Sequence, residues 1–482
     1  MIAFDNTYAE LPAACFERID PTPVKSPALI KLNEPLAIEL GLDPQWLTSA
    51  HGIDMLSGNR VVTSSKALAM AYAGHQFGNW VPQLGDGRAI LLGELFDKEQ
   101  QRHDVQLKGA GRTPFSRGGD GRNWLGPVLR EFLVSEAMAA MGVPTTRALA
   151  AVSTGEVVLR ENGPMPGGII TRVARSHIRV GTFQYFAARG DEETLQALID
   201  HVIIHQFPHL IDADNKAESL LEAVIDAQAS LVAHWQSIGF IHGVMNTDNC
   251  SISGHTIDYG PCAFMDTYQA DKVFSSIDRG ARYAYQNQPR IVQWNLVNLA
   301  QCLLPFMHQN KEESVALAQE AINRFDEVFI GHYVQRMRAK LGLMDEHDDD
   351  LALATHLLEY MEAQKLDFTV TFTQLSRHDP TSAFAAGGSL HDWHLRWQQR
   401  HNNDVAQQQQ SRELMQRVNP TVIPRNHLIE AFIDKAVKED DYSDFHSMLT
   451  AVTTPYAAEH QDSPYTFPPT PDQEVTATFC GT

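Results

Sequence analysis

The secondary-structure pattern of this chain changes near residue 175, and this change limits the folds that the chain can form. Before that point, β-favouring runs alternate with glycine-rich turns, as in AILLGEL (89–95), DVQLKGA (104–110) and GGIITRVA (167–174). After it, apolar residues recur at helical spacing, as in SLLEAVIDAQASLVAHWQSIGF (219–240). The pattern predicts an α+β fold, with a small β-rich part first and a larger helical part after it.

Two helices have boundaries that can be read from the sequence. One is expected at 127–142, because Pro127 suits a first helical position and Gly142 suits the position just past the end. Its apolar face is expected to pack on the sheet. The other is expected to begin after Asp191, whose side chain can cap the first turn. It carries an apolar stripe of Leu195, Leu198, Ile199, Val202 and Ile203.

The charge and the cysteine pattern exclude several classes of protein. The chain has 38 Lys and Arg against 59 Asp and Glu, a net charge of −21, which argues against nucleic acid or an anionic membrane as the main partner. Its 5 cysteines include no CxxC pair, so neither a disulfide framework nor a zinc site is indicated. No apolar stretch approaches the roughly 18 residues of a membrane span, and no basic leader precedes an apolar run. The expected location is the cytoplasm.

A polar passage at 242–266, HGVMNTDNCSISGHTIDYGPCAFMD, interrupts the helical pattern. Asn249 and Asp258 bracket a Ser-Gly turn, and we expect a hairpin that brings their side-chain oxygens together. Such oxygen ligands suit Mg²⁺ or Mn²⁺ carrying substrate phosphates, and Asp248 is then a candidate base for a hydroxyl. The alternative is that Asp248 and Asn249 are turn residues and Asp258 caps a loop.

A second candidate cluster lies in the β-rich part. Gly85-Asp86-Gly87-Arg88 precedes a strand, so backbone N–H groups and Arg88 can approach phosphate, although D-G is also a common hairpin signal. Lys108 ends the next strand and can project into the same space. Its carboxylate partner is Glu131 or Glu136, since both lie on the expected helix and Glu136 falls on its apolar stripe. The alternative for Lys108 is a solvated strand end.

Arginines gather at two places in this acidic chain. One group, Arg112, Arg117 and Arg122, surrounds the segment 118–121, and the other is Arg172, Arg175 and Arg179. Guanidinium groups among glycines and small polar residues suit a polyphosphate ligand, because each can bond two oxygens. The alternative is ordinary pairing with the many carboxylates.

The order of these parts is similar to that of protein kinases: a glycine-rich turn, a strand lysine and a helix glutamate, followed by Asp-Asn and Asp-Tyr-Gly in a helical part. The chain departs from kinases at several points. Asp248 and Asn249 are adjacent, no H-R-D loop occurs, the glycine turn is shorter, and TRVARSHIRVG (171–181) has no kinase counterpart.

Taken together, these residues closely resemble the selenoprotein O family, called YdiU in bacteria, of pseudokinase-like protein adenylyltransferases. The matching strings span nearly the whole chain. They are YAGHQFG (72–78), QLGDGRA (83–89), LKGAGRTPFSRGGDGR (107–122), REFLVSEAM (130–138), TRVARSHIRVGTFQ (171–184), HGVMNTDN (242–249), DYGPCAFMD (258–266), NQPRIVQWNL (287–296) and NPTVIPRNH (419–427).

The resemblance implies that ATP binds head-to-tail relative to kinases, so that AMP is transferred and pyrophosphate leaves. It implies Asp248 as proton acceptor, Asn249 and Asp258 as ligands of Mg²⁺ or Mn²⁺, and Glu131 as the partner of Lys108. The nucleotide-binding residues that it implies are Gly85, Gly87, Arg88, Lys108, Asp120, Gly121, Arg172, Arg179 and Asp258.

The resemblance also implies a protein-kinase-like bilobal fold. An N-lobe is expected at 1–175, a helical C-lobe at 176–400, and a C-terminal helical extension with a flexible tail at 401–482. Family members often end near a cysteine or selenocysteine, and Cys480 resembles that position. Cys480 is a candidate redox group that could form a reversible disulfide, and Cys262 lies beside the expected metal loop without being assigned as its partner. The alternative is a free terminal thiol.

The first functional hypothesis is therefore transfer of AMP from ATP to Ser, Thr or Tyr hydroxyls of proteins. The alternatives are transfer of UMP from UTP, phosphoryl transfer as in a kinase, and nucleotide-dependent regulation without catalysis.

Overall fold

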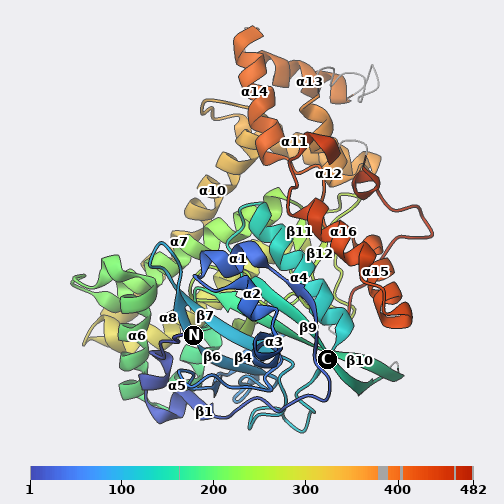
Figure 1. The fold of residues 1–482 in the computed structure, drawn as a ribbon. Helices are drawn as coiled ribbons and strands as arrows, with labels where there is room; N and C mark the ends of the chain where they lie inside the picture. The colour runs from blue at the N-terminus through green and yellow to red at the C-terminus, as the bar shows by residue number, and fades with distance from the viewer. Residues whose placement is uncertain (1, 162, 378–388, 402–404, 461–462, 480–482) are drawn as a thin grey trace.

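The computed structural model describes residues 2–161, 163–377, 389–401, 405–460 and 463–479. The chain forms a β-sheet part followed by a helical part, as the pattern predicts (Figure 1). Cys480, the predicted redox residue, lies outside the described residues.

Eight strands form one antiparallel sheet. They are β1 (Phe16–Arg18), β2 (Ala28–Leu32), β3 (Leu68–Met70), β6 (Ala89–Phe96), β7 (Arg102–Lys108), β8 (Asn123–Trp124), β9 (Arg147–Arg160) and β10 (Gly163–Ala174). The order is β1-β3-β6-β7-β10-β9-β2, and β8 pairs with β10. Two short pairs lie apart from this sheet: β4 (Gly74–Gln76) with β5 (Asn79–Val81), and β11 (Phe240–Ile241) with β12 (Ala263–Phe264).

The register of β7 and β10 places two cations on one face of the sheet. Lys108 is opposite Ile170, and Gln106 is opposite Arg172. Because side chains alternate along a strand, residues 106 and 108, together with their partners 170 and 172, share a face. The predicted lysine and one predicted arginine therefore lie on the same side of the sheet.

Helices cover both faces of the sheet. On one face lie three short helices, α1 (Glu34–Glu39), α2 (Pro44–Leu47) and α3 (Ala50–Leu56), around a separate apolar core. On the other face lies α4 (Leu125–Ala140), whose core continues into the helical part. This helix begins two residues before the predicted start, so Pro127 is its third residue, and Gly142 follows its end with a φ of +77°.

The helical part contains twelve helices in the described chain. They are α5 (Val180–Ala187), α6 (Glu192–Gln206), α7 (Lys216–Ser237), α8 (Gln288–Met307), α9 (Lys311–Asn323), α10 (Phe325–Lys340), α11 (Asp350–Gln364), α12 (Phe368–Leu375), α13 (Ser389–Arg400), α14 (Val405–Val418), α15 (Asn426–Glu439) and α16 (Ser443–Val452). Asp191 caps α6 as predicted, and the five residues of the predicted stripe are buried. Over the described ranges, no helix has both the length and the apolar character that crossing a bilayer requires.

The C-terminal helices first lie away from the sheet part and then pack against it. Helices α11 to α14 lie at one end of the molecule and share an apolar core with residues of α10, β11 and β12, whereas α15 and α16 lie beside α4 (Figure 1). Arg425, just before α15, is fully buried and bonds Asp266 at 2.5 Å and Asp367 at 2.9 Å. The described part of the expected tail also contacts the body, because the Thr478 N–H donates to the Phe274 carbonyl at 2.7 Å.

Candidate active site

One cavity of 680 Å³ is lined by both parts of the chain. Eight of the predicted site residues line it: Gly85, Gly87, Arg88, Asp120, Gly121, Asp248, Asn249 and Asp258. Lys108, Arg172 and Arg179 do not line the cavity themselves, but they contact Asp258 or Asp248, which do. Neither Arg112 nor Arg175 lines the cavity.

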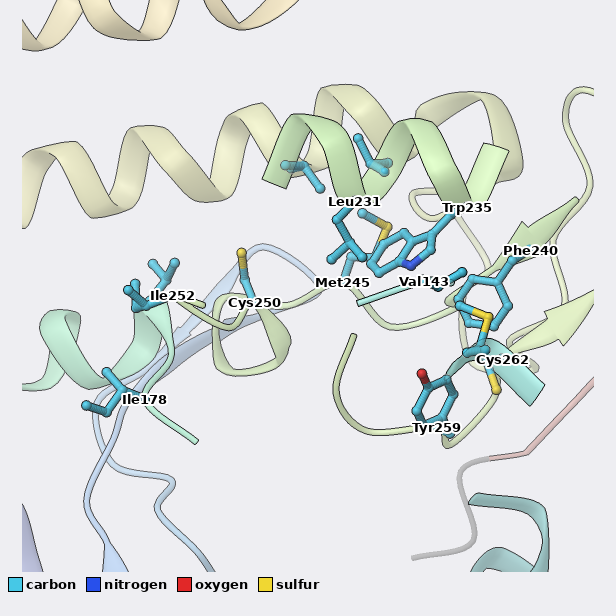
Figure 2. Packing of buried hydrophobic residues seen from close by; sticks show 14 of the residues in the cluster. Val143, Ile178, Leu231, Trp235, Phe240, Met245, Cys250, Ile252, Tyr259 and Cys262 are labelled. Atoms are coloured by element: carbon cyan, nitrogen blue, oxygen red, sulfur yellow. The ribbon is translucent and has the colours of Figure 1, made fainter. Parts of the chain in front are cut away.

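The segment that carries the acidic residues is fixed by its own apolar side chains. Figure 2 shows Met245, Cys250 and Tyr259 packed in a cluster with Leu231 and Trp235 of α7. Burial of these residues, which are all at most 5% exposed, holds the loop in place while the polar residues between them face the cavity.

The predicted hairpin between Asn249 and Asp258 does not form. Ser251 forms its bridge with Arg179, and Thr256 forms its bridge with Thr145, so the two halves pair with other segments and not with each other. The predicted turn at Gly254 is present, with a φ of +71°. These longer-range partners still bring Asn249 and Asp258 to one cavity.

Two cations and two carboxylates form a buried cluster behind the cavity. Lys108 Nζ lies 2.8 Å from Glu131 Oε2 and 2.6 Å from Asp258 Oδ1. Arg172 bonds the same two carboxylates, through Nε to Glu131 and through Nη2 to Asp258 Oδ1 at 3.0 Å. The partner of the lysine is thus Glu131. Glu136 instead bonds Arg147 at 2.8 and 2.9 Å.

These ion pairs keep Asp258 charged. Burial by itself would raise the pKa of Asp258, but Lys108 and Arg172 hold that pKa well below its usual range. For the same reason the pKa of Glu131 is lowered despite its burial, with Arg172 the larger cause. Asp258 is therefore a carboxylate at neutral pH, with its second oxygen available to a cation in the cavity.

Asp258 also has an unusual backbone. Its φ is +70°, in the left-handed region that costs most residues energy but that Asp and Asn adopt more readily. A buried bond between the Tyr259 hydroxyl and the Thr145 hydroxyl fixes the next residue. Strain of this kind persists only where the surroundings hold it, as they do here.

Asp248 lies in the turn Thr247–Asn249 and is 7% exposed. Its Oδ1 atom has no hydrogen-bond partner, and its Oδ2 accepts one bond, from Gln76 Nε2 at 3.4 Å. Arg179 donates to the Asp248 backbone carbonyl at 3.1 Å. Burial raises the pKa of Asp248 to about 6, a value suited to accepting a proton near neutral pH.

In the metal-free protein, Asp248 is expected to titrate near pH 6. Because burial raises its pKa to about 6, the form that accepts a proton is present above that pH and disappears below it. Carbon-13 NMR of labelled aspartate carboxyls measures this, with the Asp248 resonance assigned by its loss in Asp248→Asn. A midpoint at the ordinary aspartate value would contradict the expectation.

The oxygen donors fit a divalent ion that also binds phosphate. Asn249 donates its side-chain N–H to the Val244 carbonyl at 3.0 Å, which leaves its side-chain oxygen as the free acceptor. Asp258 supplies a carboxylate oxygen to the same cavity. No group of three or more His, Cys, Asp or Glu suited to a metal occurs among the described residues. Two protein ligands are enough for Mg²⁺, which takes its remaining ligands from phosphate and water.

Four arginines line the cavity together with the acidic segment: Arg88, Arg117, Arg122 and Arg160. Arg88 donates to Asn123 Oδ1 at 2.7 Å, and Arg160 donates to Asp120 Oδ2 at 2.8 Å. The glycine turn beside them is anchored by Asp86, whose buried carboxylate accepts a bond from the Met70 N–H at 3.1 Å. This wall is suited to an anionic ligand.

Sequence reasoning missed several lining residues. Tyr72 and Gln76 belong to a string used only for the family resemblance, and no chemistry was assigned to them. Arg160 is the last residue of β9, and no glycine or cationic residue next to it in the sequence marked it as a candidate. Asn246, which is 2% exposed, also lines the cavity. Asn246 lies in the polar passage 242–266 and in the string HGVMNTDN (242–249), but no role was assigned to it.

Known proteins are similar to this chain over nearly its whole length. A family model described as "Protein adenylyltransferase SelO" matches residues 1–453. The chain is 53% identical over 487 residues to a "Protein nucleotidyltransferase YdiU" of Rhodopseudomonas palustris (strain BisB5), and 99% of each chain is covered. It is 51% identical to the protein of that name from Bradyrhizobium diazoefficiens, with 99% of each covered. For the Rhizobium rhizogenes protein the identity is 53%, over 100% of this chain and 97% of the relative.

Proposed function

This chain belongs to the SelO family of protein adenylyltransferases, and from that premise we propose that it transfers AMP from ATP to Ser, Thr or Tyr hydroxyls of proteins. The chain is a nucleotidyltransferase, as its family and relatives are. The choice of AMP, the acceptor hydroxyls and the release of pyrophosphate are the proposal.

One observation carries the proposal: a single cavity is lined both by arginines and by Asp248, Asn249 and Asp258. This arrangement suits a triphosphate that is bound by arginines and by a divalent ion. We assign nucleotide contacts to Gly85, Gly87, Arg88, Lys108, Asp120, Gly121, Arg172, Arg179 and Asp258. Asn249 and Asp258 would hold Mg²⁺ or Mn²⁺.

The architecture fits a kinase-like bilobal arrangement with the nucleotide between the lobes. In this assignment, 1–175 is the N-lobe, 176–400 the C-lobe and 401–482 the C-terminal extension. The supporting features are the strand lysine bonded to Glu131 of α4, and a cavity lined from both parts. These are the features that kinases use to hold nucleotide phosphates.

The proposed reaction is an in-line displacement at the α-phosphorus. The acceptor hydroxyl gives its proton to the Asp248 carboxylate while its oxygen bonds to the α-phosphorus. The bond from that phosphorus to the bridging oxygen breaks, and pyrophosphate leaves with the electron pair. A bound divalent ion would supply further neutralisation of phosphate charge. Lys108 and the arginines stabilise charge that develops on the leaving phosphates.

Lys108→Ala is expected to lower the transfer rate by about 10²-fold to 10³-fold, as loss of one preorganised cation at a developing charge does. The measurement is kcat with saturating ATP. The control is Lys98→Ala, because Lys98 is exposed and does not line the cavity. Unchanged turnover in Lys108→Ala would remove this residue from the transition state.

ATP labelled separately at the α- and γ-phosphorus tests the proposed reaction. Retention of the α label alone on the acceptor protein is expected. Retention of the γ label would mean phosphoryl transfer, and product formed from UTP in preference to ATP would mean UMP transfer. ATP binding without any labelled product would leave a nucleotide-dependent regulator.

A further inference from the structure

The hairpin formed by β4 and β5 has a strained turn beside Asp248. Its two turn residues, Phe77 and Gly78, have φ values of +51° and +81°. Glycine adopts this conformation freely, whereas it is strained for a bulky residue such as phenylalanine. The hairpin belongs to no larger sheet, so strand pairing with the main sheet does not impose this strain.

The hairpin donates two backbone N–H groups, one from β4 and one from the turn, to the residues that precede Asp248. The Phe77 N–H donates to Asn246 Oδ1 at 2.9 Å, and the His75 N–H donates to Thr247 Oγ1 at 2.8 Å. Both acceptor residues are at most 2% exposed. The Tyr283 hydroxyl donates to the same Asn246 oxygen at 2.6 Å. The hairpin therefore holds the backbone on which Asp248 lies.

The same hairpin also confines the Asp248 carboxylate. Gln76 Nε2 lies 3.4 Å from Oδ2. A methyl group added at Gly74 would lie 2.4 Å from Oδ1, so the absence of a side chain there makes room for the carboxylate. The carboxylate of Asp248 thus lies beside both the bare backbone of residue 74 and the side-chain amide of residue 76.

We propose that the β4–β5 hairpin positions Asp248 for proton transfer, with Gln76 and Gly74 as positioning residues. The inference rests on the proposed function, because it gives the hairpin a role in the step in which Asp248 takes the proton of the acceptor hydroxyl. Gln76 orients Oδ2 through its hydrogen bond, and the absence of a side chain at Gly74 sets the space that the carboxylate can occupy.

Single substitutions in the hairpin test this. Gly74→Ala is expected to lower kcat by about 10²-fold, because a methyl group displaces the carboxylate by a large part of an ångström. Gln76→Ala is expected to lower kcat by about tenfold through loss of one hydrogen bond to a charged group. KM for ATP is expected to stay unchanged in both. The control is Asn79→Ala, since Asn79 is opposite Gln76 in the hairpin, is exposed and does not line the cavity.

A double variant separates positioning from a general effect on the fold. In the Asp248→Asn background, Gln76→Ala is expected to cause no further loss of kcat, because the two residues act as a unit. Full kcat in Gln76→Ala, a matching loss in Asn79→Ala, or additive losses in the double variant would overturn the inference. If Gly74→Ala fails to fold, the Gln76 series decides. Absence of transfer by the wild-type protein would instead refute the proposed function.

Discussion

Asp248→Asn is expected to lower the rate of nucleotidyl transfer by about 10³-fold to 10⁴-fold, in the upper part of the range for loss of a general base. Asparagine has the shape of aspartate, so the buried turn keeps its packing, but it cannot take the proton of the acceptor hydroxyl. ATP binding is expected to persist, because Asp248 has no proposed role in holding the nucleotide.

The measurement is single-turnover transfer from α-labelled ATP, together with equilibrium binding of ATP to the same variant. The matched control is Asp214→Asn, an exposed aspartate that does not line the cavity. Wild-type turnover in Asp248→Asn would remove Asp248 from the mechanism. Loss of ATP binding in parallel with turnover would assign it to the nucleotide site.

Asp258→Asn is expected to abolish metal-dependent nucleotide binding and to lower transfer by at least about 10³-fold, since a bound ion contributes several kcal/mol to charge stabilisation. The variant removes the carboxylate that Lys108 and Arg172 share, and it leaves Glu131 as their one partner in this cluster. Asparagine suits this test because it tolerates the φ of +70° at this position.

Calorimetric titration with a non-hydrolysable ATP analogue, with and without Mn²⁺, measures this effect. The wild-type protein is expected to bind the analogue more tightly with Mn²⁺, and Asp258→Asn is expected to show no such difference. Full activity of the variant at low metal concentration would contradict the assignment of Asp258 as a ligand.

Local patterns predicted the main elements of the fold well. Strands β6, β7 and β10 carry alternating or continuous apolar runs, and α6 has a capping aspartate and a buried stripe, so their signals lie within a few residues. The N-terminal strands β1 and β2 were missed. Each has at most five residues, and they pair with β3 and β9, which lie far away in sequence.

The partner of Lys108 was left open for a physical reason. Helical periodicity separates a buried face from an exposed one, but α4 is buried almost all round, between the sheet and α15 and α16. Both Glu131 and Glu136 are therefore buried, each with its own cationic partner. The spacing of residues along the sequence does not show which of two buried glutamates contacts which of two cations on different strands.

The hairpin prediction at 249–258 was wrong for a related reason. The alternating runs on both sides of Gly254 are typical of paired strands, yet Ser251 and Thr256 bridge to Arg179 and Thr145. Both partners lie more than 70 residues earlier in the chain, so a local pattern does not show them. The tertiary contacts nevertheless bring Asn249 and Asp258 to one cavity. The sequence analysis also predicted that the two side chains meet, but through a local hairpin that does not form.

The central claim is that one nucleotide contacts the cations of the sheet part and, through a metal ion, the oxygens of Asn249 and Asp258. Anomalous diffraction from crystals grown with Mn²⁺ and a non-hydrolysable ATP analogue tests it directly. We predict one Mn²⁺ peak bound by Asn249, Asp258 and nucleotide phosphates, with the arginines that line the cavity in contact with those phosphates. A nucleotide in another cavity, or a Mn²⁺ peak away from both residues, would contradict it.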